Sequence, residues 1–190
     1  VGEAKISDGK LYVKKDRGKI DEVHKIHNLD DLPGSMGIGH TRWATHGAPL
    51  QVNAHPHLDC KGQIAVIHNG IIENFAELRK ELEAHGHVLK SKTDTEIIAH
   101  LIEDGLTVEN LKFPDAVLEA VKKLEGSYSI AAISTREPDK IVCARNESPL
   151  VLGVADEGLY CASDIPALLP LTKKTVVVEN GELVTLSRED

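Results

Sequence analysis

The chain has 190 residues and a mass of 20.7 kDa, which suits one domain of ordinary size with a real hydrophobic core. Hydrophobic residues make up 41% and charged residues 27%, which excludes an intrinsically disordered chain, and no apolar run reaches the roughly 20 residues that a membrane-spanning helix needs. The formal net charge of −8, with no basic stripe to offset it, argues against a nucleic-acid partner.

The N-terminal part of the chain predicts a strand pair and a short helix. Residues 4–15 alternate around Asp8-Gly9, a turn dipeptide typical of a β-hairpin. Residues 21–34 are polar, with leucines at helical spacing before Pro33-Gly34. Because that pair cannot continue a helix, we expect a short helix that ends there.

Two further strands are expected before the helical part of the chain. Residues 37–48 hold small and polar side chains around the single Trp and predict a strand that leads into a loop. Residues 63–68 (QIAVIH) are apolar and rich in β-branched side chains, which predicts a buried strand. The Asn69-Gly70 dipeptide is expected to stop it.

Three helices are predicted next, and then several strands. The helices are expected from Asn74 to Gly86, after a cap at Thr93 or Asp94, and over about 114–125, each with one apolar face. Apolar segments at 127–134, 140–145, 150–155 and 158–163 predict strands, and 175–186 predicts a hairpin around Asn180-Gly181. This order favours an α+β fold with antiparallel sheets.

Residues 39–47 (GHTRWATHG) form the densest group of unusual side chains. Arg42 offers a planar fork that fits a carboxylate, and threonine hydroxyls and loop amides add donors. The alternative interpretation is a buried turn closed by an arginine salt bridge.

Two other short motifs also have both a functional and a structural interpretation. Asn69 and Gly70 can place two donors on a developing oxyanion, because glycine lets the backbone approach closely; the alternative is a plain Asn-Gly turn. Asp94, at a predicted helix start, can pair with a ligand ammonium or simply cap the helix.

The ten histidines and three cysteines raise the question of metal or thiol chemistry. His55 and His57, and likewise His85 and His87, are two residues apart, but no zinc spacing is present, so we expect no metal site. Cys60, Cys143 and Cys161 are predicted to be reduced thiols of a cytoplasmic protein. Cys60 has His55 and His57 upstream, and the alternatives for it are a reactive thiol and, as we expect, an ordinary loop thiol.

The motifs GHTRWATHG, NAHPH, HNGIIEN and KTDTE, in this order, resemble the class II glutamine amidotransferases, specifically the branch that aminates a sugar phosphate. SDIPALLPLTK at 163–173 agrees, and the resemblance covers nearly the whole chain. It implies a four-layer αββα N-terminal-nucleophile sandwich without its first strand and following helix. Residues 1–190 would then form one N-terminally truncated glutaminase domain.

The resemblance assigns roles to the three motifs. Arg42 would hold the α-carboxylate of L-glutamine with help from Thr45 and His46, and Asp94 would take the α-ammonium. Asn69 and Gly70 would form the oxyanion hole, and Gly70 would also contact the substrate. Trp43 would belong to a loop that closes over glutamine. No cofactor is implied.

The family nucleophile is a cysteine at the mature N-terminus whose own amine acts as the base. The chain begins at Val1, and its three cysteines are internal. We therefore expect the 190 residues alone to be inactive, with the nucleophile truncated, cleaved off, or supplied by a separate chain.

The resemblance also implies partners for the longer parent protein. Sugar isomerase domains would follow, accept the ammonia and convert fructose 6-phosphate to glucosamine 6-phosphate, in a homo-oligomer. One rival is another class II enzyme, such as an amidophosphoribosyltransferase or asparagine synthetase half. The second rival is a non-catalytic amino-acid-binding module.

Overall fold

A computed structural model describes residues 1–42 and 47–187, and its largest element is a five-stranded antiparallel sheet. The strand order is β11-β7-β6-β5-β4. The strands are β4 (His57–Leu58), β5 (Ile64–Ile72), β6 (Gly126–Ser134), β7 (Glu137–Asn146) and β11 (Leu183–Ser187).

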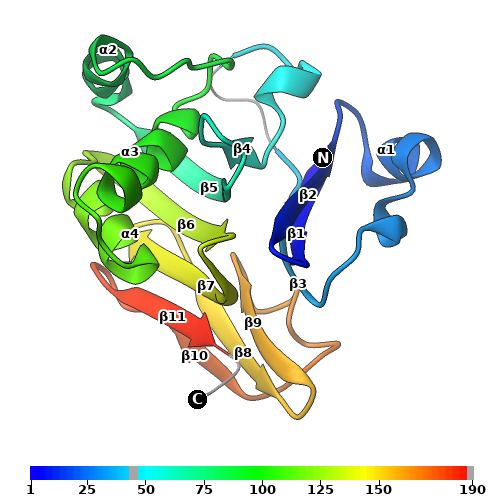
Figure 1. The fold of residues 1–190 in the computed structure, drawn as a ribbon. Coiled ribbons are helices and arrows are strands. Elements are labelled where there is room, and N and C mark those ends of the chain that lie inside the picture. Colours follow the sequence, from blue (N-terminus) through cyan, green and yellow to red (C-terminus); the bar gives the residue numbers. More distant parts are fainter. Residues whose placement is uncertain (43–46, 188–190) are drawn as a thin grey trace.

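Two three-stranded antiparallel sheets complete the β structure. The first has the order β2-β1-β3, from β1 (Gly2–Ser7), β2 (Lys10–Lys15) and β3 (Met36–His40). The second has the order β10-β8-β9, from β8 (Val151–Ala155), β9 (Gly158–Ala162) and β10 (Thr175–Val177). Figure 1 shows both on the side of the five-stranded sheet that the main group of helices leaves open.

Helices α2 (Phe75–Ala84), α3 (Glu96–Thr107) and α4 (Phe113–Lys122) cover the other face, while α1 (Ile20–His27) lies outside β2 (Figure 1). Two short 3-10 turns span Leu29–Asp31 and Gln51–Asn53. One apolar core includes Phe113 and Ile98 from the helices and Ile130 from the sheet. A second includes Ile6 of β1, Ile133 of β6 and Leu150, which directly precedes β8. The predicted α+β sandwich of antiparallel sheets is confirmed.

The N-terminal predictions are confirmed except for one helix end. Asp8 and Gly9 both adopt positive φ, 50° and 69°, as the tight turn of the β1–β2 hairpin requires. Helix α1 stops well before Pro33-Gly34, because Asn28 takes a left-handed conformation and its N–H donates to the His24 carbonyl.

Two predictions about Asn-Gly dipeptides are wrong. Strand β5 continues through Asn69-Gly70, which pair with Ser129 and Tyr128 of β6. The segment 175–186 is not a hairpin, because β10 pairs with β8 and β11 with β7, in different sheets. The Asn180-Gly181 turn is instead fastened to the end of β7, where Asn180 accepts from the Glu147 amide and Gly181 donates to the Arg145 carbonyl.

The helix caps also differ from prediction. Asn74 precedes α2, but its side chain bonds to the backbone of Lys123 and Glu125 and does not cap the helix. Thr95, rather than Thr93 or Asp94, stands directly before α3, and its side chain does not cap either. Both helices therefore depend on packing and on long-range contacts for their position. None of the described helices is long and apolar enough to cross a membrane.

Candidate active site

A cavity of about 160 Å³ lies where the end of β3, the middle of β5 and the start of α3 meet. It brings together all three motifs singled out in the sequence. Its lining consists of His40, Thr41, Arg42, His55, His68, Asn69, Gly70, Thr93, Asp94 and Thr95. A cation, a carboxylate and a carboxamide therefore share one small space, which is the arrangement that a free amino acid with a side-chain amide would need.

Arg42 follows β3 and carries the positive charge of the cavity. Its Nη2 donates to the Gly47 carbonyl at 3.0 Å and its Nη1 to the Ala48 carbonyl at 3.4 Å. Burial lowers the pKa of the guanidinium, and the Asp94 carboxylate opposes that shift. The two groups thus interact electrostatically across the cavity while Arg42 remains charged.

Asp94 is a buried carboxylate held by the neighbouring strand. Its Oδ2 accepts a hydrogen bond from the Ile72 amide at 3.0 Å, at the end of β5. The functional interpretation of Asp94 is therefore compatible with the structure, and the capping interpretation is not, since the side chain bonds to β5 and not to α3. A carboxylate fixed in this way can receive an ammonium group with little rearrangement.

Gly70 occupies a position that only glycine fits. Its φ is +123°, and a Cβ atom built on it would lie 2.1 Å from the Ser127 carbonyl oxygen of the paired strand. The missing side chain lets β5 and β6 approach closely beside the cavity. The backbone next to Asn69 is therefore set by the sheet and not by a loop.

Asn69 ends a chain of side-chain hydrogen bonds that we call the histidine chain: Asn69, His40, His55, Thr95 and His68. The Asn69 Oδ1 lies 2.8 Å from His40 Nε2, and His40 Nδ1 lies 2.8 Å from His55 Nδ1. His55 Nε2 lies 2.9 Å from the Thr95 hydroxyl, which is 3.0 Å from His68 Nδ1. Four separate segments meet in this network: β3, the segment before β4, β5 and the start of α3.

One proton arrangement satisfies every bond of the histidine chain. A carboxamide oxygen only accepts, so His40 must donate from Nε2 and accept at Nδ1 from His55. His55 then accepts at Nε2 from Thr95, whose oxygen accepts from His68. Burial lowers the pKa of His40 and, together with the nearby His40 ring, lowers that of His55 well below its ordinary value, so both rings are neutral. The chain fixes Asn69 Oδ1 and leaves the amide nitrogen as the donor toward the cavity.

A buried layer lies behind the cavity. His57 Nε2 is 3.0 Å from the Thr93 hydroxyl, and burial, with a smaller effect of Lys15, lowers the His57 pKa to about 3. Lys15 donates from Nζ to the Ala54 and Pro56 carbonyls at 2.7 and 2.8 Å, and burial lowers its pKa to about 8. These contacts hold the segment that carries His55.

Sequence reasoning missed the histidine chain as a unit. His40, His55 and Thr95 stand in the motifs GHTRWATHG, NAHPH and KTDTE, but none of the three was predicted to have a role in the site. The His55 side chain is buried, and this burial is what would mark it as part of a network. No local sequence pattern shows it. Trp43, Thr45 and His46, to which the resemblance assigned roles, lie outside the described residues.

Comparisons with known proteins identify a family and several relatives of this chain. Residues 40–170 match the glutamine amidotransferase domain family. The glutamine–fructose-6-phosphate aminotransferase (isomerizing) of Methanothermobacter thermautotrophicus is 53% identical over 180 residues, which cover 95% of this chain and 30% of that protein. The protein of the same name from Pyrococcus horikoshii is 48% identical over 99% of this chain and 31% of its own length. The chain thus spans about a third of the length of these relatives.

Solved structures show the same fold. The glutamine phosphoribosylpyrophosphate amidotransferase from B. subtilis, complexed with ADP and GMP, superposes with a TM-score of 0.82 at 28% identity, over 99% of this chain and 41% of that one. A glutamine aminotransferase class-II domain protein from Silicibacter pomeroyi superposes with a TM-score of 0.67 at 14% identity, over 99% of this chain and 87% of that one. The second likeness concerns the fold alone.

Proposed function

The chain belongs to the glutamine amidotransferase domain family, and from this premise we propose that it hydrolyses L-glutamine as the glutaminase part of a longer enzyme. In that enzyme the ammonia would pass to fructose 6-phosphate and give glucosamine 6-phosphate. The name that the similar relatives carry supports this acceptor. The observation that carries the glutaminase proposal is that Arg42, Asp94, Asn69 and Gly70 line one cavity.

We assign the two ends of the substrate to the two charged groups. The α-carboxylate would bind Arg42, whose fork fits a carboxylate, and the α-ammonium would bind Asp94. The side-chain amide would then extend toward β5. Following the family resemblance, Trp43, Thr45 and His46 would also contribute to substrate binding.

In the reaction a thiolate would attack the amide carbon of glutamine, and its oxygen would become an oxyanion. The Asn69 Nδ2 and the Gly70 amide would donate to that oxygen, where preorganised donors contribute most. A proton delivered to nitrogen would release ammonia, and water would hydrolyse the thioester to glutamate. In the family the thiol and the proton-transferring amine belong to an N-terminal cysteine.

We infer that the nucleophile reaches the site through a second cavity of about 310 Å³. This cavity shares His40 and Asn69 with the first and is bounded by Gly39 of β3 and Cys161 of β9. Among the described residues no pairing joins β3 to β9, so each presents an edge there. An extended segment between these edges would place its end beside Asn69.

We further propose that residues 1–190 are the glutaminase domain of a cytoplasmic homo-oligomer that also contains sugar isomerase domains. The length of the similar relatives, about three times that of this chain, supports the further domains. The cysteines Cys60, Cys143 and Cys161 are free thiols, which suits a reducing compartment.

A second acceptor deserves a direct comparison because of the B. subtilis structure. The full-length protein should be supplied with glutamine and either fructose 6-phosphate or phosphoribosyl pyrophosphate. We expect glucosamine 6-phosphate in the first reaction. Amination of phosphoribosyl pyrophosphate instead would keep the glutaminase proposal and overturn the proposed acceptor.

Glutamate release by the full-length protein tests the binding assignment. Asp94→Asn should raise the KM for glutamine by about tenfold or more, because the ammonium loses its charged partner. Asp139→Asn, at an exposed site on β7, is the matched control and should change neither KM nor kcat. An unchanged KM in Asp94→Asn would contradict the assignment.

A further inference from the structure

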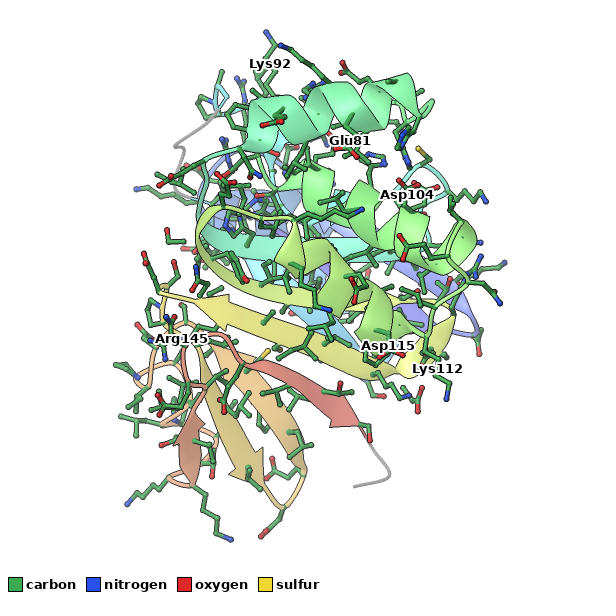
Figure 2. The ribbon with its side chains drawn as sticks, turned by 90° about the vertical axis from the view of Figure 1, so that its left-hand side faces the viewer. Glu81, Lys92, Asp104, Lys112, Asp115 and Arg145 are labelled. Atoms are coloured by element: carbon green, nitrogen blue, oxygen red, sulfur yellow. The ribbon has the colours of Figure 1, made fainter. Side chains whose placement is uncertain are left out.

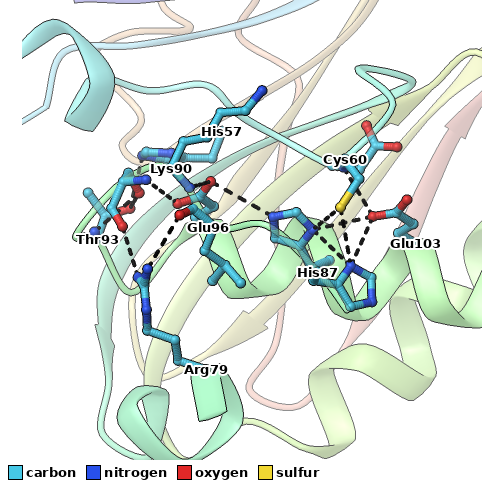
Figure 3. Close-up of polar contacts among 12 residues, drawn as sticks. His57, Cys60, Arg79, His87, Lys90, Thr93, Glu96 and Glu103 are labelled. Carbon is cyan, nitrogen blue, oxygen red and sulfur yellow. Dashed lines mark hydrogen bonds and ion pairs between the residues drawn. The ribbon is translucent and has the colours of Figure 1, made fainter. Parts of the chain in front are cut away.

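Four side chains outside the proposed active site point their ligand-type atoms at one another: Cys60, His87, His100 and Glu103. We call them the Cys60 cluster. Cys60 lies between β4 and β5, His87 between α2 and α3, and the other two on α3. Figure 3 shows Cys60, His87 and Glu103 converging, with dashed lines between them.

The distances between the ligand atoms of the Cys60 cluster match those between neighbouring ligands of a tetrahedral metal ion. Cys60 Sγ lies 3.5 Å from both His87 Nδ1 and His100 Nδ1. The two Nδ1 atoms are 3.2 Å apart, and Glu103 Oε2 lies 3.2 Å from the first and 3.3 Å from the second. Zinc bonds of ordinary length would give edges of about 3.3 Å between nitrogen and oxygen ligands and about 3.5 Å between sulfur and nitrogen.

Carboxylates behind the histidines turn the Nδ1 lone pairs inward. His87 Nε2 lies 2.8 Å from Asp104 Oδ1, so the ring donates there and its Nδ1 is left as a lone-pair donor. His100 Nε2 faces Glu96 Oε1 at 3.8 Å, beyond hydrogen-bond distance, so this carboxylate favours a proton on Nε2 only electrostatically. The Cys60 amide orients Glu103 by donating to Oε2 at 3.1 Å.

The convergence of these atoms on one point is the feature that a metal ion would use. The two Nδ1 atoms and Glu103 Oε2 form a triangle whose sides are all between 3.2 and 3.3 Å. If both rings carried a proton at Nδ1, the two protons would face each other. If neither did, three electron-rich atoms would meet with only the Cys60 thiol proton between them. If only His100 did, His87 Nδ1 and Glu103 Oε2, at 3.2 and 3.3 Å, would share that one proton. A cation at the centre would bind all four atoms at once.

We propose that the Cys60 cluster binds one Zn²⁺ ion. Binding would release the Cys60 proton to solvent, and the thiolate and the Glu103 carboxylate would balance the charge of the metal. All four positions of a tetrahedral site are then taken by protein atoms, which is typical of a structural rather than a catalytic zinc. The expectation of no metal site rested on spacing along the chain, and here the fold joins ligands from three segments.

The metal would fasten two loops to α3. The loop with Cys60 continues from the segment of His55 and His57, and α3 begins directly after Asp94 and Thr95. A zinc ion would thus hold the helix start and the histidine segment in register from the side away from the cavity. This role concerns stability and does not depend on the proposed glutaminase function.

Metal analysis of untagged protein, grown with zinc and then dialysed, tests the proposal. We expect about one zinc ion per chain in the wild type and in His85→Asn, a neighbouring exposed histidine outside the cluster. We expect a loss of at least about tenfold in zinc content in His87→Asn and Cys60→Ala. Wild-type protein with no more zinc than Cys60→Ala would overturn the proposal.

Cobalt substitution provides a readout even if a variant fails to fold. Wild-type protein loaded with Co²⁺ should show a thiolate-to-cobalt charge-transfer band and the intense visible bands of tetrahedral cobalt. Chelation should lower the Tm of the wild type and of His85→Asn, and should leave that of Cys60→Ala unchanged. A wild-type cobalt spectrum without the thiolate band would overturn the proposal independently of the variants.

Discussion

The histidine chain and the Cys60 cluster use the same residue type in opposite ways. In the chain, His40 and His55 each donate from one ring nitrogen and accept at the other, so the hydrogen bonds all point in one direction and end at the Asn69 oxygen. In the cluster, His87 and His100 both direct Nδ1 toward one point, together with a sulfur and a carboxylate.

The difference shows what decides the task of a buried histidine. In the histidine chain, the Asn69 oxygen can only accept, and this fixes where each proton lies. As a result the Asn69 carboxamide is held at the cavity. In the Cys60 cluster, carboxylates next to the Nε2 atoms favour protons on those atoms. The Nδ1 lone pairs of both rings then point toward the same centre. Figure 2 shows α3 among the helices that cover the sheet, with Asp104, the outer partner of His87, labelled on it.

The largest effect that we expect concerns the residue to which the histidine chain leads. Asn69→Ala in the full-length protein should lower the kcat of glutamine hydrolysis by about 100- to 1000-fold, because one oxyanion donor is lost. The KM should change little, since this bond forms in the transition state. Steady-state glutaminase kinetics provide the test, and a wild-type kcat would remove Asn69 from the mechanism.

Gly70→Ala should lower the stability of the fold. The new Cβ would lie 2.1 Å from the Ser127 oxygen at a φ of +123°, and we expect a loss of about 2 kcal/mol or more in the free energy of unfolding. Urea unfolding measures it. Gly158→Ala is the control, because a Cβ there meets nothing within 4 Å, and its stability should stay within about 0.5 kcal/mol. Equal effects at both positions would contradict the close approach of β5 and β6.

Breaking the histidine chain one step from Asn69 should have a smaller effect. His40→Phe removes the donor to Asn69 Oδ1 and should lower kcat by about tenfold, the value of one hydrogen bond, with little change in KM. His40→Gln keeps a donor and should retain more of the activity. If the two variants lose equal activity, or neither loses any, His40 does not position Asn69.

The last effect that we expect is a gradual change of stability with pH. Burial lowers the pKa of His55 and His57, the latter to about 3, so these rings are neutral in the fold and become charged on unfolding below their ordinary value of about 6.5. The unfolded state then binds more protons, and stability must fall as the pH falls from about 7 to about 5, by up to about 1.4 kcal/mol per pH unit for each histidine.

Urea unfolding over that pH range measures this slope. His57→Gln should reduce it by about one proton, whereas the same change at the half-exposed His24 should leave it unchanged. A stability that stays constant between about pH 7 and about pH 5 would contradict neutral buried histidines.

Local patterns predicted the elements whose causes are local. The Asp8-Gly9 hairpin follows from turn chemistry, and the helices α2 to α4 follow from apolar residues at helical spacing. The Asn180-Gly181 dipeptide led to a wrong prediction because the strands on either side of it do not pair with each other. Strand β10 pairs with β8, and β11 pairs with β7. A turn signal fixes a change of direction and does not say which sheet receives each strand.

The candidate site was predictable in its parts through family resemblance, and not in its connections. Arg42, Asn69 and Asp94 stand in recognisable motifs, and the structure places all three on one cavity. The bond from His40 to Asn69 joins residues 29 positions apart, and that from Cys60 to His100 joins residues 40 apart. Pairings at such separations depend on the packing of sheets and helices, which no local pattern contains.

A crystal structure of the protein with L-glutamate tests the central claim most directly. We expect the ligand to occupy the cavity between β3, β5 and α3, with its α-carboxylate on Arg42, its α-ammonium on Asp94 and its side-chain carboxylate beside Asn69 and Gly70. A ligand bound in reverse, or in a different cavity with Arg42 and Asp94 untouched, would contradict it.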